Sequence, residues 1–144
     1  MIVMCWIHNY NIVDELPDCV GFVYLITNLT NNRKYIGKKL SHFTKTSTKT
    51  VTLKSGVKKK KKIKKQVESD WKTYWSSSLE LQNDVKIHGE ENFTREILFY
   101  CTSKAECTYR EASEQFLLKV LESDEFYNGQ ISCRIHKSHI KNKL

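Results

Sequence analysis

Proline and long apolar runs are scarce in this chain. One proline occurs among 144 residues, and hydrophobic side chains make up 40% of them, a composition that suits one compact domain. The apolar start, residues 1–7, has no basic segment before it, and it is too short for a secretory signal or a membrane span. We therefore expect a cytoplasmic protein that does not enter a membrane.

Cysteine pairs of the kind that form disulfide frameworks are also missing. The five cysteines are an odd number, and no two of them are spaced Cys-x-x-Cys. This pattern fits reduced thiols inside a cell better than the disulfides of a secreted protein. Cys133, His136 and His139 offer three zinc-binding groups, but their spacing matches no standard zinc site and further ligands would have to come from elsewhere.

Acidic residues are absent from one segment of the chain. Between Lys38 and Lys65 lie 12 of the 24 Lys and Arg residues and none of the 16 acids. The rest of the chain, with 12 basic and 16 acidic residues, has a net charge of −4, against +8 for the whole. A block of like charge repels itself unless a polyanion neutralises it, so nucleic-acid phosphate is the expected partner. The alternatives are a solvated surface loop and a nuclear-localisation-type patch.

The same segment carries the alternation of a β-hairpin. Threonine occupies every second position from Thr44 to Thr52, and Ser55-Gly56 is a turn signal. We expect a long, mobile hairpin over residues 43–67, within a lysine-rich insertion at about 38–67. Its lysines position the protein on DNA without reading bases, because a point charge on phosphate carries little sequence information. The expected DNA-binding residues are Lys38, Lys58, Lys59, Lys60, Lys61, Lys62, Lys64 and Lys65.

Two short aromatic strands lie before this insertion, at residues 20–27 and 34–37. The polar turn between them, residues 28–32, is rich in Asn and Thr, which is typical of a β-hairpin. This connection places Tyr24 and Tyr35 on one face of the paired strands. Taken alone, two tyrosines in half-buried strands are ordinary packing residues.

Helix and strand signals follow the insertion. Residues 68–75 combine acids with aromatic side chains and favour a short helix with Trp71 and Trp75 on one face. The three serines at 76–78 precede an expected helix at 79–88, which Gly89 ends. Residues 93–101 have the composition of a third strand.

A capping-box sequence, Ser103-x-x-Glu106, predicts a second long helix that reaches about residue 121. Two glutamates, Glu111 and Glu114, lie three positions apart on its expected surface. One well-placed carboxylate is sufficient for Mg²⁺, which keeps water and phosphate in its other positions. The expected apolar face of the helix consists of Ala105, Tyr109, Ala112, Phe116, Leu117, Val120 and Leu121.

Five motifs in order, between Val20 and about Cys133, resemble those of the GIY-YIG nuclease superfamily, and the middle of the chain is similar to its intron-encoded and phage endonucleases. The first motif has one residue more than the Gly-Ile-Tyr pattern. The five are Gly21-Phe22-Val23-Tyr24, Tyr35-Ile36-Gly37, Ile87-His88-Gly89 before the third strand, Glu114-Gln115-Phe116, and Tyr127-Asn128-Gly129.

The resemblance implies an α+β fold with a small three-stranded antiparallel sheet flanked by helices. The nuclease domain would span residues 20–134, between an N-terminal extension at 1–19 and a basic tail at 135–144. The implied activity is a metal-dependent DNA endonuclease that hydrolyses phosphodiester bonds with Mg²⁺ or Mn²⁺, in the host-cell cytoplasm if a phage encodes it.

The resemblance also implies a role for individual residues. Glu114 would bind the metal, with Glu111 as its neighbour. Tyr24 would be the general base and Tyr35 would orient the attacking water, which requires a phenol pKa lowered by the metal and by lysines. Asn128 matches the asparagine of the family's Tyr-Asn motif.

One departure from the family pattern concerns the residue that contacts the scissile phosphate. The family carries an arginine on the first helix after the Tyr-Ile-Gly strand, and here no arginine occurs between Gly37 and Asp70. Lys72 is the first choice to replace it, because it belongs to the first expected helix after the insertion. Lys39 and His42 are the other candidates.

Two other functions fit the same residues: a non-catalytic nucleic-acid-binding protein of this fold, and a ribonuclease. Neither a helix-turn-helix nor a zinc-finger pattern accompanies the motifs, so high base specificity is not expected. Homing, restriction-like and phage genome-degrading roles all fit the motifs.

Overall fold

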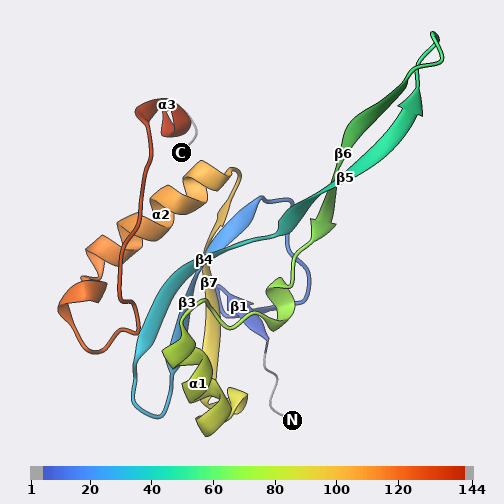
Figure 1. Cartoon of the computed structure of the whole chain (residues 1–144). Coiled ribbons are helices and arrows are strands. Elements are labelled where there is room, and N and C mark those ends of the chain that lie inside the picture. The colour runs from blue at the N-terminus through green and yellow to red at the C-terminus, as the bar shows by residue number, and fades with distance from the viewer. Residues whose placement is uncertain (1–4, 142–144) are drawn as a thin grey trace.

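The computed structural model describes residues 5–141 of the chain. Figure 1 shows a twisted sheet with helices on both sides and a long two-stranded arm that projects from the body. The mixed α+β fold predicted from the sequence is present. The main sheet has the strand order β2-β1-β7-β3-β4, from β1 (Trp6–His8), β2 (Asn11–Val13), β3 (Gly21–Asn28), β4 (Lys34–Leu40) and β7 (Phe93–Cys101).

The prediction of a three-stranded sheet is wrong, because two short strands from the expected N-terminal extension complete a sheet of five. β1 pairs in parallel with β7, with Trp6 opposite Arg95, and β2 pairs antiparallel with β1. Asn9 and Tyr10 make the tight turn between them with φ values of 48° and 67°. Strands of three residues are too short to show a period of two in the sequence, so this part of the sheet left no clear signal.

The β3–β4 hairpin forms as predicted. Its register places Tyr24 opposite Gly37 and Ile26 opposite Tyr35. The Asn28 side chain accepts a hydrogen bond of 3.0 Å from the Thr30 backbone in the turn, a local contact typical of Asn. The rings of Tyr24 and Tyr35 lie 6.2 Å apart between centroids, which confirms that both tyrosines share one face.

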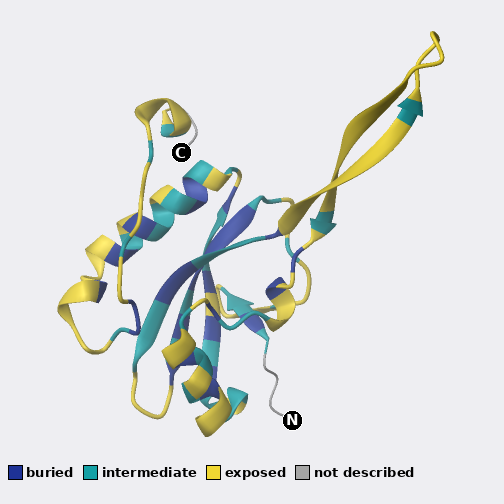
Figure 2. Cartoon of the chain, viewed as in Figure 1, coloured by how far each residue is buried: buried dark blue, intermediate teal, exposed yellow. Residues whose placement is uncertain are grey.

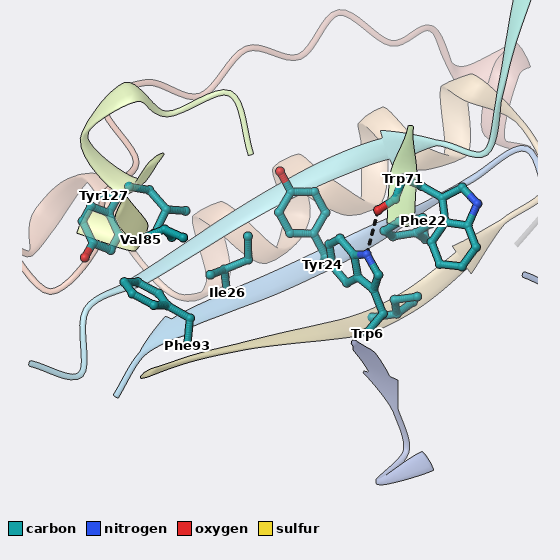
Figure 3. Packing of buried hydrophobic residues seen from close by; sticks show 10 residues of the cluster. Trp6, Phe22, Tyr24, Ile26, Trp71, Val85, Phe93 and Tyr127 are labelled. Carbon is teal, nitrogen blue, oxygen red and sulfur yellow. Dashed lines mark hydrogen bonds between the residues drawn. The ribbon is translucent and has the colours of Figure 1, made fainter. Parts of the chain in front are cut away.

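The two long helices cover opposite faces of the sheet. α1 (Leu79–His88) packs Leu81 and Val85 into a core with Trp6, Tyr24 and other aromatic residues, part of which Figure 3 shows. α2 (Lys104–Leu117) packs on the other face, where Cys107 lies in a smaller core with Val23 and Ile36. Figure 2 shows that burial is concentrated in the sheet and on the inner sides of these helices.

The helix predicted at residues 68–75 is only a single 3₁₀ turn, η1 (Trp71–Thr73). Apart from the 3.3 Å bond that the Tyr74 N–H donates to the Trp71 carbonyl, carbonyl groups of this segment accept hydrogen bonds from side chains of the sheet. The Trp71 carbonyl accepts a 2.7 Å bond from Trp6 Nε1, and the Lys72 and Tyr74 carbonyls accept bonds from Arg95 Nη1. These tertiary contacts hold the segment extended against the sheet.

Two expectations for the helix α2 are also wrong. The helix ends at Leu117, not near residue 121, because Lys119 adopts a left-handed φ of 53° before the short turn η3 (Val120–Glu122). Most of its predicted apolar face points to solvent, with Phe116 66% and Leu117 72% exposed. The face that lies on the sheet is more polar and consists of Glu106, Cys107, Ala112 and Gln115.

The predicted hairpin at residues 43–67 forms the arm, β5 (His42–Thr52) and β6 (Lys58–Glu68). Gly56 makes its turn with a φ of 82°, as the Ser55-Gly56 signal predicts. The remaining short elements are η2 (Glu90–Asn92) and α3 (Lys137–Ile140). Within residues 5–141, no helix is long and apolar enough to cross a membrane.

Candidate active site

A polar cavity of about 300 Å³ opens at the outer edge of β4. Four segments meet there: the Tyr-Ile-Gly strand, the serines before α1, the inner face of α2, and the Tyr-Asn-Gly loop with the residues after it. Tyr35, Glu111 and Asn128 all lie in its wall, although 93 positions separate the first from the last in the sequence. The lining residues are Tyr35, Ser77, Ser78, Glu111, Gln115, Tyr127, Asn128, Gly129, Gln130 and Ser132.

Side chains from α2 and from the Tyr-Asn-Gly loop form hydrogen bonds with backbone groups on the free edge of β4. The Asn128 amide accepts from the Ile36 N–H at 3.1 Å and donates to the Ile36 carbonyl at 2.8 Å. Gln115 Nε2 donates to the same carbonyl at 3.1 Å. An unpaired edge strand needs such partners for its backbone groups. Asn128 therefore fixes the strand that carries Tyr35.

Glu111 is the one carboxylate among the described residues that line the cavity. It is half-buried, and the Lys38 backbone N–H donates a hydrogen bond to it. Burial raises the pKa of Glu111, and this effect outweighs the nearby Lys38 ammonium group and the hydrogen bond, which lower it. A carboxylate that is partly desolvated beside open space is a suitable oxygen ligand for a hard cation.

Glu114, which the sequence favoured as the metal ligand, does not line this cavity. Residues four apart share a helix face, and Glu111 lies one turn from Cys107 and from Gln115, both of which are buried against the sheet. The sequence places Cys107, Glu111 and Gln115 at every fourth position, but this row is polar and does not stand out as a buried helix face. The family resemblance assigns the metal to Glu114, whereas the structure brings Glu111 to this cavity.

Tyr24 lies behind Tyr35, in the core. The Tyr24 ring packs against β4 at Gly37. A Cβ atom added to Gly37 would lie 2.5 Å from the Tyr24 hydroxyl oxygen and 2.8 Å from the Tyr35 ring. Position 37 therefore has no room for a side chain while the two phenols hold this arrangement. On the solvent side, the Tyr35 hydroxyl lies 3.1 Å from Ser77 Oγ.

Both phenols hold their protons more tightly than free tyrosine. Burial raises the pKa of Tyr24 well above its ordinary value, and neighbouring Tyr74, Tyr35 and Glu111 raise it further. The pKa of Tyr35 is also raised, first by burial and then by Glu111, while the Ser77 contact opposes the shift. The lowered phenol pKa expected from the sequence is therefore absent in the protein alone.

Among the three basic candidates for the missing arginine, Lys39 contacts Tyr74, which neighbours Tyr24. Lys39 Nζ lies 3.9 Å from the Tyr74 ring centroid and forms a 2.6 Å ion pair with Asp70. Tyr74 in turn packs against Tyr24, with ring centroids 6.1 Å apart. Lys39 also shares its strand face with Tyr35, because the two are four positions apart on β4.

Lys72 and His42 lie elsewhere. Lys72 borders a hollow with Cys5 and Asp14, and His42 bonds to Ser41 Oγ at the base of the arm. Lys38, expected to bind DNA, instead donates a 2.6 Å hydrogen bond to Thr108 on α2.

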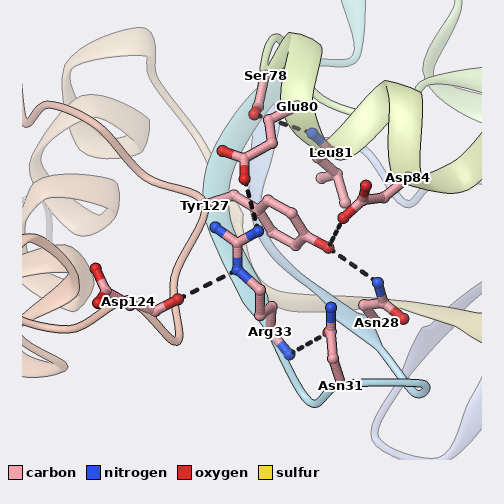
Figure 4. Close-up of polar contacts among 9 residues, drawn as sticks. All are labelled: Asn28, Asn31, Arg33, Ser78, Glu80, Leu81, Asp84, Asp124 and Tyr127. Atoms are coloured by element: carbon pink, nitrogen blue, oxygen red, sulfur yellow. Dashed lines mark hydrogen bonds and ion pairs between the residues drawn. The ribbon is translucent and has the colours of Figure 1, made fainter.

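A network that the sequence did not predict supports the wall of the cavity at Tyr127 (Figure 4). The Tyr127 hydroxyl donates to Asp84 at 2.7 Å and accepts from Asn28 Nδ2 at 2.9 Å. The Arg33 guanidinium lies 4.1 Å over the Tyr127 ring and pairs with Glu80 at 2.6 Å. These contacts join the cavity loop to α1 and to the β3–β4 turn.

The remaining sequence candidates are not gathered at the cavity. The lysines predicted to bind DNA from Lys58 to Lys65 are exposed along β6. Across residues 5–141, no three His, Cys, Asp or Glu side chains come together as a metal-binding group, and Cys133, His136 and His139 form no such group either.

The chain matches one family model, described as "Putative endonuclease segE, GIY-YIG domain", over residues 6–131. This range includes β1, both tyrosine strands, the arm, both long helices and the Tyr-Asn-Gly loop. Searches of curated proteins and of solved structures give no significant match. The motifs, the tyrosine pair on one strand face and the match over most of the chain lead to one conclusion: this chain belongs to the GIY-YIG endonuclease family.

Proposed function

We propose that this protein is a metal-dependent endonuclease that hydrolyses phosphodiester bonds of DNA in the cavity beside Tyr35. The observation that carries the proposal is the convergence of Tyr35, Glu111 and Asn128 on one open polar cavity. Membership of the GIY-YIG family supports nuclease chemistry. The exposed lysine arm gives the positive charge that a DNA backbone requires.

The residues present fit Mg²⁺ or Mn²⁺ at Glu111. Mg²⁺ is commonly held by one or two carboxylates, with water and substrate phosphate in its other positions. Glu111 offers such a carboxylate on open space, so we assign the metal-binding role to Glu111 in place of Glu114. When bound there, the cation would polarise the phosphoryl oxygen and stabilise the leaving oxygen.

The two tyrosines act in sequence on the attacking water. Tyr35, at the cavity wall and held by Ser77, orients the water, and Tyr24 behind it accepts the proton. Both phenol pKa values are raised in part by the negative charge of Glu111. A divalent cation on the carboxylate would reverse that contribution and favour the phenolate form, while burial stays the largest cause of the raised pKa values.

Lys39 takes the place of the family arginine in this proposal. It lies on the strand face of Tyr35 and against Tyr74, and its partner Asp70 is largely exposed. The Lys39 side chain is 10% exposed and paired with Asp70, so binding of the scissile phosphate by its ammonium group requires an exchange of this partner. Lysine supplies charge without the bidentate geometry of arginine, so we expect slower turnover and an unchanged reaction class.

Plasmid cleavage tests the proposal directly. Purified protein is incubated with supercoiled plasmid DNA in Mg²⁺, in Mn²⁺ and in EDTA. Nicked or linear products only with metal, and none with Glu111→Gln, are the expected result. Binding without cleavage in any metal indicates a non-catalytic DNA-binding protein, and cleavage of RNA alone indicates a ribonuclease.

A further inference from the structure

The arm, β5 and β6, forms a separate two-stranded sheet. Nearly all of its side chains are exposed, and Val51 and Val67 are the half-buried exceptions. Each strand has 11 residues, which gives a length of about 36 Å at a rise of about 3.3 Å per residue. One turn of duplex DNA has about the same length, roughly 34 to 36 Å.

Lysine occurs on both faces of the arm. The register places Lys45 opposite Lys65 and Lys49 opposite Lys61, and like charges directly opposite each other destabilise a strand pair. One face carries Lys58, Lys60, Lys62 and Lys64 beside threonines, and the other carries Lys45, Lys49, Lys59, Lys61 and Lys65. An anion on one side of the ribbon leaves the lysines of the other face without a counter-charge.

A DNA groove supplies phosphate on both sides. The major groove is about 12 Å wide and admits a two-stranded β-ribbon, whereas the minor groove, at about 6 Å, does not without distortion. The major groove of A-form RNA is deep and narrow. Of these surfaces, only the major groove of DNA matches the width of the arm and has charge on both of its walls.

The chain connection limits the distance between the arm and the candidate active site. β4 runs directly into β5 through Ser41, and His42 lies seven positions after Tyr35. This gives at most about 23 Å from the site to the base of the arm. With the arm itself, the reach is at most about 59 Å, or about 17 base pairs at about 3.4 Å each.

We propose that the arm, residues 42–68, lies in the major groove of duplex DNA on one side of the cleaved bond, with its lysines on the phosphates of both walls. This inference rests on the proposed function for its substrate. It adds which groove of the DNA the arm contacts, that the arm lies on one side of the cleaved bond, and what length of DNA it contacts. The protein then requires a duplex that extends up to about 17 base pairs beyond the scissile phosphate.

Two matched variants test the contact with both walls. One replaces Lys60, Lys62 and Lys64 by Gln, and the other replaces Lys59, Lys61 and Lys65 by Gln. Each removes three charges from one face only. Binding to a 40-base-pair duplex is measured in EDTA over a range of salt, so the result does not depend on cleavage.

Both variants should flatten the slope of log affinity against log salt by similar amounts, up to about 2.7 units for three phosphate contacts. A loss in only one variant means that the arm lies flat on DNA by one face, and no loss in either means that it does not bind DNA. Either result overturns the proposal.

Wild-type protein tests the groove and the length. Methyl green, which occupies the major groove, should displace the protein, and distamycin, which occupies the minor groove, should not. Affinity should rise as the duplex lengthens from about 10 to about 20 base pairs and then level off. Displacement by distamycin, or equally tight binding of a 10-base-pair duplex or of double-stranded RNA, overturns the proposal. Loss of plasmid cleavage with these binding results intact would count against the proposed function alone.

Discussion

At position 111 a carboxylate is held between the edge of β4 and the open cavity. The Lys38 backbone N–H donates a hydrogen bond to it, and Tyr35 lines the same cavity. Its burial is unfavourable for a charged group, because a desolvated carboxylate binds its proton more tightly. A residue that costs stability and yet faces a solvent-filled cavity has the features expected of a functional group.

Glu111→Gln should reduce cleavage by at least about 10³-fold, because the amide cannot replace the carboxylate as a cation ligand. DNA affinity measured without metal should stay nearly unchanged. Glu114→Gln is the matched control on the same helix and should retain most of its activity. Plasmid cleavage by both variants decides between them, and the reverse order of effects would return the metal site to Glu114.

The same substitution has a predicted effect on stability with a definite sign. Because the folded-state pKa of Glu111 is raised, its contribution to stability is complete at low pH and is lost as pH rises through that value. Gln does not titrate. The unfolding free energy of Glu111→Gln relative to wild type should therefore increase from about pH 4 to about pH 7. Urea unfolding in metal-free buffer measures this, and a decrease over that range would contradict the burial argument.

Tyr24→Phe and Tyr35→Phe should each slow cleavage by about 10² to 10⁴ with DNA binding unchanged. Phe keeps the rings over Gly37 and removes only the hydroxyl groups. The Tyr24 hydroxyl is hydrogen-bonded to Tyr74, so its loss should cost about 1 kcal/mol of stability. Single-turnover cleavage and thermal unfolding separate the two roles. Full activity in Tyr24→Phe would make that residue a packing residue only.

Among the secondary-structure elements, β4 both positions Tyr35 and connects the sheet to the arm. Its edge is bonded to Asn128 and Gln115, which holds Tyr35 at the cavity, and its end continues directly into the arm. DNA bound to the arm and the phosphate at the tyrosines are therefore connected through one strand. The Lys39–Asp70 ion pair and the Ser69 to Ser41 backbone bond close the base of the arm.

Replacing Lys58 to Lys62 with Gln should flatten the salt dependence of DNA affinity by up to about 4.5 units, at about 0.9 for each phosphate contact. All sequences should lose affinity alike, because these contacts do not read bases. Turnover at saturating DNA should change far less, since the candidate catalytic residues lie outside the arm. A change in sequence preference would show that the arm reads bases, and an unaltered slope would make it a solvated loop.

For the molecule as a whole, the short first strand is as important as the longer ones. The Trp6 ring is 1% exposed, its Nε1 donates to the Trp71 carbonyl, and the Arg95 guanidinium lies 4.7 Å from its ring centroid. Trp6 thereby joins the sheet to the segment that carries Tyr74.

Trp6→Ala should lower the unfolding free energy by about 3 to 5 kcal/mol, as expected when a fully buried aromatic side chain is removed. Ile12→Ala, on the neighbouring strand β2 where the side chain is 56% exposed, should cost less than about 1 kcal/mol. Urea unfolding curves measure both. A cost for Trp6→Ala as small as that of the control would show residues 5–13 to be a dispensable extension.

Local patterns in the sequence determined the β3–β4 hairpin, the helix at 79–88, the third long strand and the arm. The hairpin, the helix and the arm depend on contacts between residues that are close along the chain: the Asn28 turn, the Ser78 cap that accepts from Leu81 N–H, and the Gly56 turn. The third strand pairs with distant β1 and β3, and its composition alone identified it. Charge segregation identified the arm for a similar reason, because its strands pair only with each other. Such signals are complete within about ten to thirty residues, so they can be found without the fold.

Tertiary structure alone decided which glutamate faces the cavity, where Lys39 lies and which strands complete the sheet. Glu111 faces the cavity because α2 presents its more polar face to the sheet and leaves Phe116 and Leu117 exposed. The helix at residues 71–73 stops after a single 3₁₀ turn because Trp6 and Arg95 bind carbonyl groups of this segment. These choices depend on partners 20 or more positions away, and helix or strand periodicity carries no information about such partners.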